Sequence, residues 1–409
     1  MRIAQRFGMG NAAQRFGVGK AAQRAAQRAG ALAAGRPDAQ GRAEWPLALV
    51  SAVVALAACG AIAVFSATAP FDLSRAVPPH FTRQLLALPL GAAVAWAVSR
   101  LPLPLWRRAA LPLWGVGVAA LAFTLLFGVS AGGARRWLSL GGLGFQPAEA
   151  ARLTTLLAIA WLLSRPQTGR SGLSGRQVLQ ALGLAVLPAA LCVLQPDFGG
   201  AVILCLLAGV LVFVAGASLR HLAAPLAVGI AGLVAYSAMQ PYAARRWVGF
   251  LDPWARATTE GFQLVQSFVA FGRGGWAGVG LGNGRQKLFY LPEAHNDFIL
   301  SVIAEETGLL GVLVVLGAFA LLSAAGLGIA QGARDRFARL AATGATGLLA
   351  IPGALNAAVA MGCLPTKGLP LPFVSYGRSS LLICCAAVGL LLAVARDSRA
   401  GGRRWRGAL

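Results

Sequence analysis

Apolar runs of about twenty residues alternate with short polar segments from residue 46 to residue 394, and each run is long enough for one helix to cross a bilayer. The runs do not alternate at every second residue, as the strands of a membrane barrel would. Because backbone groups in lipid must be satisfied internally, the pattern predicts an all-α polytopic membrane protein. We expect about ten spans, at 46–67, 84–99, 109–128, 148–164, 178–195, 199–216, 221–240, 298–325, 337–361 and 374–394.

The composition supports a membrane location. Only 12% of the 409 residues are charged, whereas 57% are hydrophobic. A soluble domain would carry about 25% charged residues. The six cysteines lie in or beside the apolar runs without a CxxC pair, and there are only three histidines. Neither a disulfide framework nor a zinc site is therefore expected.

Basic residues are in large excess, with 36 Lys and Arg against 13 Asp and Glu and a net charge of +23. Many lie in two tails, at 1–45 and 396–409, which flank a transmembrane domain at 46–395. Basic residues concentrate on the cytoplasmic side of membrane proteins, so we expect both termini in the cytoplasm. The large loop at 241–297, between the seventh and eighth spans, is then extracytoplasmic. No RNA- or DNA-binding signature combines aromatic residues with this charge, so no nucleic-acid partner is expected.

The expected outer loops contain most of the polar motifs. In GARRWLSLGGLGFQPAEAARL, Arg135 and Arg136 are candidates to bind a diphosphate, since a guanidinium group pairs bidentately with phosphate oxygens. Glu149 and Arg152 follow at the start of the next span, spaced to form an ion pair. Anchoring of the arginines at the lipid interface, with one local ion pair, explains the same residues.

A second pair of arginines, Arg245 and Arg246, opens the loop at 241–297. A loop of this length is usually functional or disordered, and its apolar content argues for order. The segment at 262–271 has the pattern of an amphipathic helix on the outer surface. Lys367 lies among prolines between the last two spans, as a phosphate contact or a snorkelling lysine.

Acidic residues gather where the long loop enters the eighth span. Asp297 suits a general base whose pKa is raised by partial burial, and it also suits an N-cap. Glu293 and His295 lie just before it, as positioning candidates. Glu305 and Glu306 lie deeper, where they would form ion pairs inside the bundle or mark an ion path.

Two further segments have ordinary structural explanations. Asp197, in QPDFGGA, is expected to cap the helix that follows a tight turn. The glycine-rich GVGLGNG at 278–284 follows no strand, and the chain has no GxxxxGK[ST], so we expect a turn-rich loop and no nucleotide site.

Several of these motifs together resemble the SEDS family of membrane glycosyltransferases. They are ARRWLSLGGLGFQPAE, RRWVGFLDPW, FVAFGRGGWAGVGLGNGRQKLFYLPEAHNDFI, AEETGLLGV and GCLPTKGLPLPFVSYG, in this order. The resemblance covers residues 47–394, and QKLFYLPEAHNDF is more similar to the cell-division branch than to the elongation branch. The family pattern SYGGSS is replaced by SYGRSS, so Arg378 puts the local backbone geometry in doubt.

The resemblance implies an inner-membrane peptidoglycan glycosyltransferase that polymerises lipid II, an undecaprenyl-diphosphate-linked disaccharide-peptide, at the division septum. It places the family's catalytic aspartate on Asp297. It also implies a class B penicillin-binding protein, which is a transpeptidase, and other divisome proteins as partners.

This interpretation assigns roles to the polar residues. Asp297 is the expected base, and the expected substrate-binding residues are Arg135, Arg136, Glu149, Arg152, Arg245, Arg246, Glu293, His295 and Lys367. A divalent cation, Mg or Mn, would share the charge of the diphosphate. Three alternatives stay open: a lipid II transporter or flippase, a polymerase for elongation, and a scaffold that recruits the division synthase. A transporter would be expected to have related halves with broken helices, and the sequence has no clear internal repeat.

Overall fold

A computed structural model describes residues 41–71, 77–131, 134–140, 143–165, 173–218, 222–225, 227, 229, 231–232, 241–292 and 294–406. The predicted tail is outside these residues up to residue 40, as is Glu293. Most of the predicted span at 221–240 is also outside them.

The described residues form a bundle of long helices, which confirms the all-α polytopic expectation. Its helices are α3 (Gly41–Thr68), α4 (Pro79–Arg100), α5 (Leu103–Phe127), α6 (Pro147–Leu163), α7 (Gly175–Leu194), α8 (Phe198–Val214), α12 (Ile299–Gly332), α13 (Arg336–Ala360) and α14 (Arg378–Arg406). Within the described ranges, seven are long and apolar enough to cross a membrane, and α6 and α8 have 17 residues each. The number of ten spans stays a prediction.

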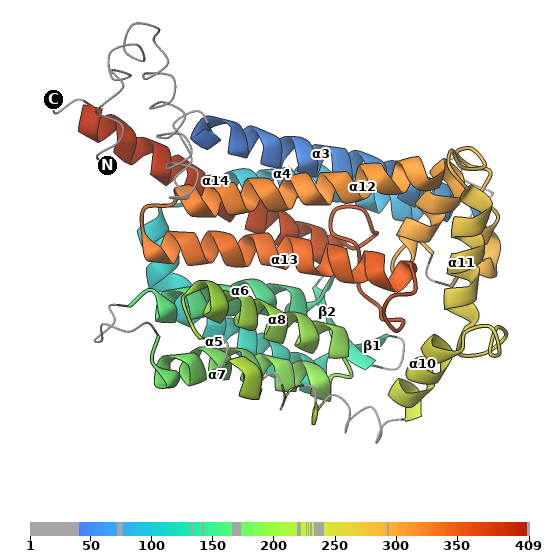
Figure 1. Cartoon of the computed structure of the whole chain (residues 1–409), viewed down its shortest axis with the longest axis horizontal. Coiled ribbons are helices and arrows are strands. Elements are labelled where there is room, and N and C mark those ends of the chain that lie inside the picture. Colours follow the sequence, from blue (N-terminus) through green and yellow to red (C-terminus); the bar gives the residue numbers. More distant parts are fainter. Residues whose placement is uncertain are drawn as a thin grey trace, which may run out of the picture.

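The helices run side by side, with α13 near the middle of the bundle (Figure 1). Helix α13 contacts α6, α8, α12 and α14, while α12 also packs on α3, and α14 packs on α4. Small residues permit close approach: a Cβ added at Gly353 of α13 would lie 2.7 Å from the Phe319 ring of α12. Such small residues let helix backbones approach in a membrane protein, where burial of apolar surface drives little association.

The connections at one end of the bundle are structured (Figure 1, right). They include a three-stranded antiparallel sheet of β1 (Val129–Ala131), β2 (Ala134–Leu140) and β3 (Leu143–Phe145), which the helical pattern did not predict. Helices α10 (Pro241–Leu251) and α11 (Phe262–Gly274) and the π-helical turn η3 (Gln286–Tyr290) lie in the long loop. The start of α3 and the end of α14 lie at the opposite end of the bundle.

Helix α11 was predicted correctly as amphipathic, but its apolar face packs on protein. Leu264, Val265 and Ala270 are buried, and the helix contacts α12 and α13. The Ser267 hydroxyl reaches the Ser301 hydroxyl of α12 at 2.7 Å and donates to the Ala360 carbonyl at 2.6 Å. Protein therefore covers the apolar face, and the position of this helix on the outer surface stays a prediction.

Helix α12 is broken at Gly308, where φ is +66° and glycine avoids the penalty of a side chain. The loop after α11 fills the break. Val279 N donates to the Glu305 carbonyl at 3.0 Å, and Leu309 N donates to the Gly275 carbonyl at 2.9 Å. Backbone groups freed by the kink are thus satisfied by the loop, which fixes the loop against the helix.

Candidate active site

Asp297 is half-buried in the turn just before α12. The helix begins at Ile299 with Phe298 at its N-cap, so Asp297 does not occupy the cap position. The backbone of this turn is held from α13, because Asn356 Nδ2 donates to the Asp297 carbonyl at 2.8 Å and to the Leu369 carbonyl at 2.6 Å. Asn356 therefore ties the acid to the loop between α13 and α14.

The loop between α13 and α14, residues 361–377, lies directly against the carboxylate of Asp297. A Cβ added at Gly368 would lie 3.0 Å from Asp297 Oδ2, and Gly368 is exposed. The Ser375 hydroxyl donates to the Asn296 carbonyl at 2.5 Å and accepts from Leu371 N at 2.8 Å. This loop and the Asp297 turn thus form one hydrogen-bonded unit.

Phe373 in the same loop has a φ of +66°, a conformation that costs free energy for a residue with a side chain. Its carbonyl lies so close to α3 that a Cβ at Gly60 would be 2.5 Å from it. Close packing between α3 and the loop therefore holds the strained residue in place.

Two cations reach the same loop. Arg246 of α10 donates through Nη1 to the Thr366 carbonyl at 2.6 Å. Burial lowers the pKa of the neighbouring Lys367, the positive charge of Arg246 lowers it further, and Asp197 opposes the shift. Lys367 directly precedes Gly368, so two of the predicted phosphate-binding residues lie in or on the loop that borders Asp297.

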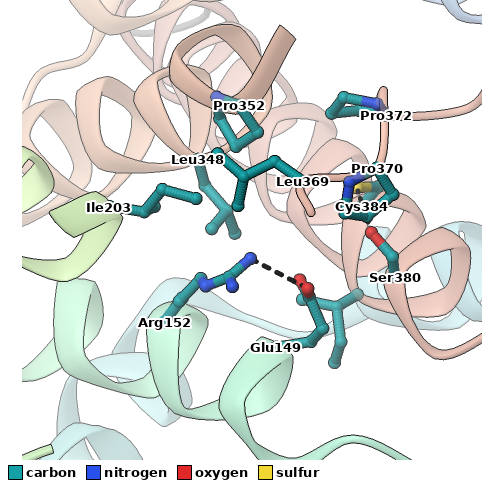
Figure 2. Close-up of a pocket in the computed structure, with 11 residues that line it drawn as sticks. Glu149, Arg152, Ile203, Leu348, Pro352, Leu369, Pro370, Pro372, Ser380 and Cys384 are labelled. Atoms are coloured by element: carbon teal, nitrogen blue, oxygen red, sulfur yellow. Dashed lines mark hydrogen bonds and ion pairs between the residues drawn. The ribbon is translucent and has the colours of Figure 1, made fainter. Parts of the chain in front are cut away.

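Glu149 and Arg152 form the predicted ion pair, with Nη1 and Oε1 separated by 2.8 Å and both side chains about 95% buried (Figure 2). They line a small cavity together with Leu369 and Pro370 of the 361–377 loop. Figure 2 shows the pair on one side of this cavity and the loop on the other. The cavity therefore separates the pair from the loop that contains Lys367 and Gly368.

The two arginines of the first motif are not equivalent. They are successive residues on β2, at a point where the pairing with β1 shifts register, from Ser130 opposite Arg135 to Val129 opposite Trp137. Arg136 donates to the carbonyls of Gln195 at 3.0 Å and Pro196, whereas Arg135 is exposed. Arg136 thus holds the turn before α8, where Asp197 caps Gly200 N at 3.0 Å, as predicted.

The remaining predicted residues divide between surface and interior. Arg245 is exposed on α10, next to the loop-bound Arg246. Glu305 is fully buried, pairs with Arg273 at 3.1 Å, and accepts from the amides of Arg285 and Gln286, each at 3.0 Å. The predicted pairing of this acid inside the bundle is confirmed.

Glu306 makes a second buried ion pair, with Lys287 Nζ at 2.7 Å. The Ser66 hydroxyl of α3 joins it, donating to Glu306 at 2.7 Å and accepting from Lys287 at 2.7 Å. The predicted pairing of Glu306 is also confirmed. Together, the pairs at Glu305 and Glu306 fasten the segment before Asp297 to α12 and α3.

The sequence did not indicate that several residues near Asp297 belong to the site. Asn356 is one polar residue in an apolar run, and His80 follows two prolines. Tyr376 lies in a motif in which Lys367 attracted the functional interpretation. Their proximity to Asp297 comes from contacts between distant segments, as for Tyr376 N, which donates to the His295 carbonyl at 3.0 Å.

Arg378 occupies the position where the family pattern has glycine. It is the first residue of α14 and is half-buried. Its φ is not positive, so the helix start accepts a side chain at this position. The next residue, Ser379, donates to the Gly144 carbonyl at 3.1 Å and accepts from Gln146 N at 3.2 Å, which joins α14 to β3.

The predicted divalent cation requires oxygen ligands. Among the residues that the structure describes, no three His, Cys, Asp or Glu side chains gather into a metal site. Magnesium is commonly held by one or two carboxylates together with substrate phosphates. Asp297 offers one such carboxylate, so the cation stays a prediction that depends on the substrate.

The bundle of apolar helices defines a multi-pass membrane protein. Asp297 and the loop that contains Lys367 and binds Arg246 form a candidate polar site at one end of this bundle. Residues 47–400 match the FtsW/RodA/SpoVE family model, described as "Cell cycle protein". The chain belongs to this family.

Curated relatives are similar over most of their length. The probable peptidoglycan glycosyltransferase FtsW of Coxiella burnetii is 38% identical over 86% of this chain and 96% of its own. The probable peptidoglycan glycosyltransferase FtsW of Thioalkalivibrio sulfidiphilus is 41% identical over 87% and 90%.

Solved structures are also similar. One, described as "Structural coordination of polymerization and crosslinking by a peptidoglycan synthase complex", aligns with a TM-score of 0.71 and 35% identity over 86% of this chain and 97% of the other. The rod shape determining protein RodA of Thermus thermophilus aligns with a TM-score of 0.63 and 33% identity over 85% and 96%.

Proposed function

We propose that this protein is a peptidoglycan glycosyltransferase that polymerises lipid II on the outer face of the inner membrane during septal wall synthesis. The observation that carries the proposal is the arrangement around Asp297. Its carboxylate lies against the exposed Gly368, in a loop that also contains Lys367 and binds Arg246. Membership of a family whose FtsW relatives are named as peptidoglycan glycosyltransferases supports the reaction.

Asp297 acts as the general base. It takes the proton from the 4-hydroxyl of the acceptor sugar while that oxygen attacks the anomeric carbon of the lipid-linked donor strand. The bond between the anomeric carbon and the diphosphate breaks in the same step, and its electron pair leaves with the phosphate oxygen. Because the donor is already activated by its diphosphate, the reaction needs no ATP.

The leaving diphosphate needs neutralisation of its charge more than it needs a proton. Lys367 and Arg246 supply positive charge on the loop that borders Asp297. Arg246 is bound to a backbone carbonyl and is therefore held in place before substrate arrives. Arg135 and Arg245, both exposed, bind phosphate during approach of the lipid-linked substrate.

The Glu149–Arg152 pair supports the loop from behind. It borders Leu369 and Pro370 across the small cavity, so it positions the segment that follows Gly368. His295, and Glu293, which lies outside the described residues, are the proposed acceptor-positioning residues of the Asp297 turn.

The proposed partners follow from the reaction and from the similar structures. A class B penicillin-binding protein would crosslink the strands that this protein makes, as the structural neighbour described as a peptidoglycan synthase complex suggests. Other divisome proteins would hold the enzyme at the septum, with both basic tails in the cytoplasm.

Purified protein, lipid II and a divalent cation, with and without the transpeptidase partner, provide the test. Wild-type protein is expected to make glycan strands, and Asp297→Ala and Asp297→Asn are expected to lower the rate by about a hundredfold or more while the protein still folds. Full polymerisation by Asp297→Ala would contradict the proposal. Transport of lipid II into sealed vesicles without polymer would favour a flippase instead.

A further inference from the structure

Three half-buried rings from separate segments meet beside the Asp297 turn. His80 lies at the start of α4, His295 lies two residues before Asp297, and Tyr376 lies just before α14. The ring centroid of His80 is 5.4 Å from that of His295 and 5.1 Å from that of Tyr376, and the last two are 6.0 Å apart. We call these three residues the ring cluster.

The ring cluster is fixed relative to the proposed base. Tyr376 N donates to the His295 carbonyl at 3.0 Å, and the Ser375 hydroxyl donates to the Asn296 carbonyl at 2.5 Å. From α4, Gln84 Nε2 approaches the Ser375 carbonyl at 3.5 Å, one turn after His80. Contacts with the two residues directly before Asp297 therefore set the position of the rings.

The chemistry of the ring cluster differs from that of the cations near Asp297. Imidazole and phenol rings combine an apolar face with polar edge atoms that donate and accept hydrogen bonds. A sugar ring has the matching features, a face of C–H groups and an edge of hydroxyl groups. Lys367 and Arg246 instead suit phosphate.

We propose that His80, His295 and Tyr376 form a platform that binds the acceptor saccharide and directs its 4-hydroxyl toward Asp297. This inference rests on the proposed polymerase function. The base removes its proton from the acceptor hydroxyl, so the saccharide next to Asp297 is the acceptor's. His80 and Tyr376 are then substrate-binding residues of the reaction, in addition to His295.

Initial rates against lipid II concentration test the platform in purified full-length protein. His80→Ala is expected to raise KM roughly three- to tenfold, which corresponds to the binding free energy of one ring contact, with little change in kcat. His80→Phe restores the ring and is expected to keep KM near the wild-type value. A merely structural role for His80 would instead lower kcat and thermal stability together.

Phe81 offers a matched control on the same helix. Its ring packs on Phe65 of α3 with centroids 5.1 Å apart and belongs to a different contact. Phe81→Ala loosens the same end of α4 and is expected to leave KM unchanged. An equal rise in KM for Phe81→Ala, or an unchanged KM for His80→Ala, would overturn the platform.

A second measurement uses the soluble disaccharide of lipid II as a competitor. It is expected to inhibit wild-type polymerisation, and to inhibit His80→Ala more weakly by the same factor as the rise in KM. Equal inhibition of both proteins would overturn the proposal. Absence of polymer from the wild-type protein is a different result, because it would contradict the polymerase function itself.

Discussion

The carboxylate of Asp297 lies against Gly368, with Oδ2 only 3.0 Å from the point where a side chain at Gly368 would begin. This distance is shorter than ordinary contact between a carbon and an oxygen. The absence of a side chain at Gly368 therefore leaves room for the acid beside an exposed stretch of backbone, where a substrate hydroxyl can reach it.

Gly368→Ala is expected to reduce kcat by roughly tenfold or more, because the added methyl group would displace the carboxylate, and displacements of about 1 Å are costly in catalysis. The φ of Gly368 does not require glycine, so the fold is expected to be retained. Polymerisation rates and thermal unfolding measure the two effects. Gly272→Ala is the control, because a Cβ there meets nothing within 4 Å, and a loss of activity in that variant as well would contradict this explanation.

Asn356→Ala removes the donor that joins the Asp297 turn to the 361–377 loop. We expect a loss of about 1–3 kcal/mol in stability, since a buried carbonyl and a partly buried one lose their partner, together with a fall in kcat. Thr346→Val on the same helix is the control. This variant loses only the hydrogen bond that the Thr346 hydroxyl donates to the Ala342 carbonyl at 2.9 Å. A fall in kcat for Asn356→Ala no larger than that for Thr346→Val would show that Asn356 does not position the acid.

The buried pair of Lys287 and Glu306 is expected to behave asymmetrically. Replacing one member, as in Glu306→Leu or Lys287→Met, leaves a buried charge unpaired and is expected to destabilise the protein by about 3–5 kcal/mol. The double variant is expected to recover much of this loss. Thermal unfolding of the four proteins in a double-mutant cycle measures the coupling, and additive effects would contradict it.

The lowered pKa of Lys367 predicts a pH dependence. Lysine is charged below its pKa, so a lowered pKa means that its positive charge is lost at a lower pH than for an ordinary lysine. At alkaline pH, kcat/KM is therefore expected to fall, and this fall should occur at a pH below the usual pKa of lysine. Lys367→Arg is expected to move this fall to higher pH, because a guanidinium stays charged. An unchanged pH profile in Lys367→Arg would exclude Lys367 as its source.

Local sequence was informative where the chemistry is local. The spacing of Glu149 and Arg152 predicted their ion pair, and the turn containing Asp197 predicted the cap of α8. The segment at 262–271 was amphipathic as expected, but an apolar face on a helix suits lipid and a neighbouring helix equally well. Similarly, adjacency of Arg135 and Arg136 suggested a joint role, whereas Arg136 binds the turn before α8 and Arg135 is exposed.

The sequence by itself determined the class of the protein, because the length and spacing of apolar runs follow from the thickness of a bilayer. It also predicted Asp297 as the base, because an acid at the entry to an apolar span is costly and lies within a recognisable motif. Only the tertiary structure decided what surrounds that acid. Gly368 and Asn356 contact it, and His80 and Tyr376 contact His295 in the same turn. These residues come from segments far apart in the chain, and such contacts depend on helix packing, which leaves no periodic pattern in the sequence.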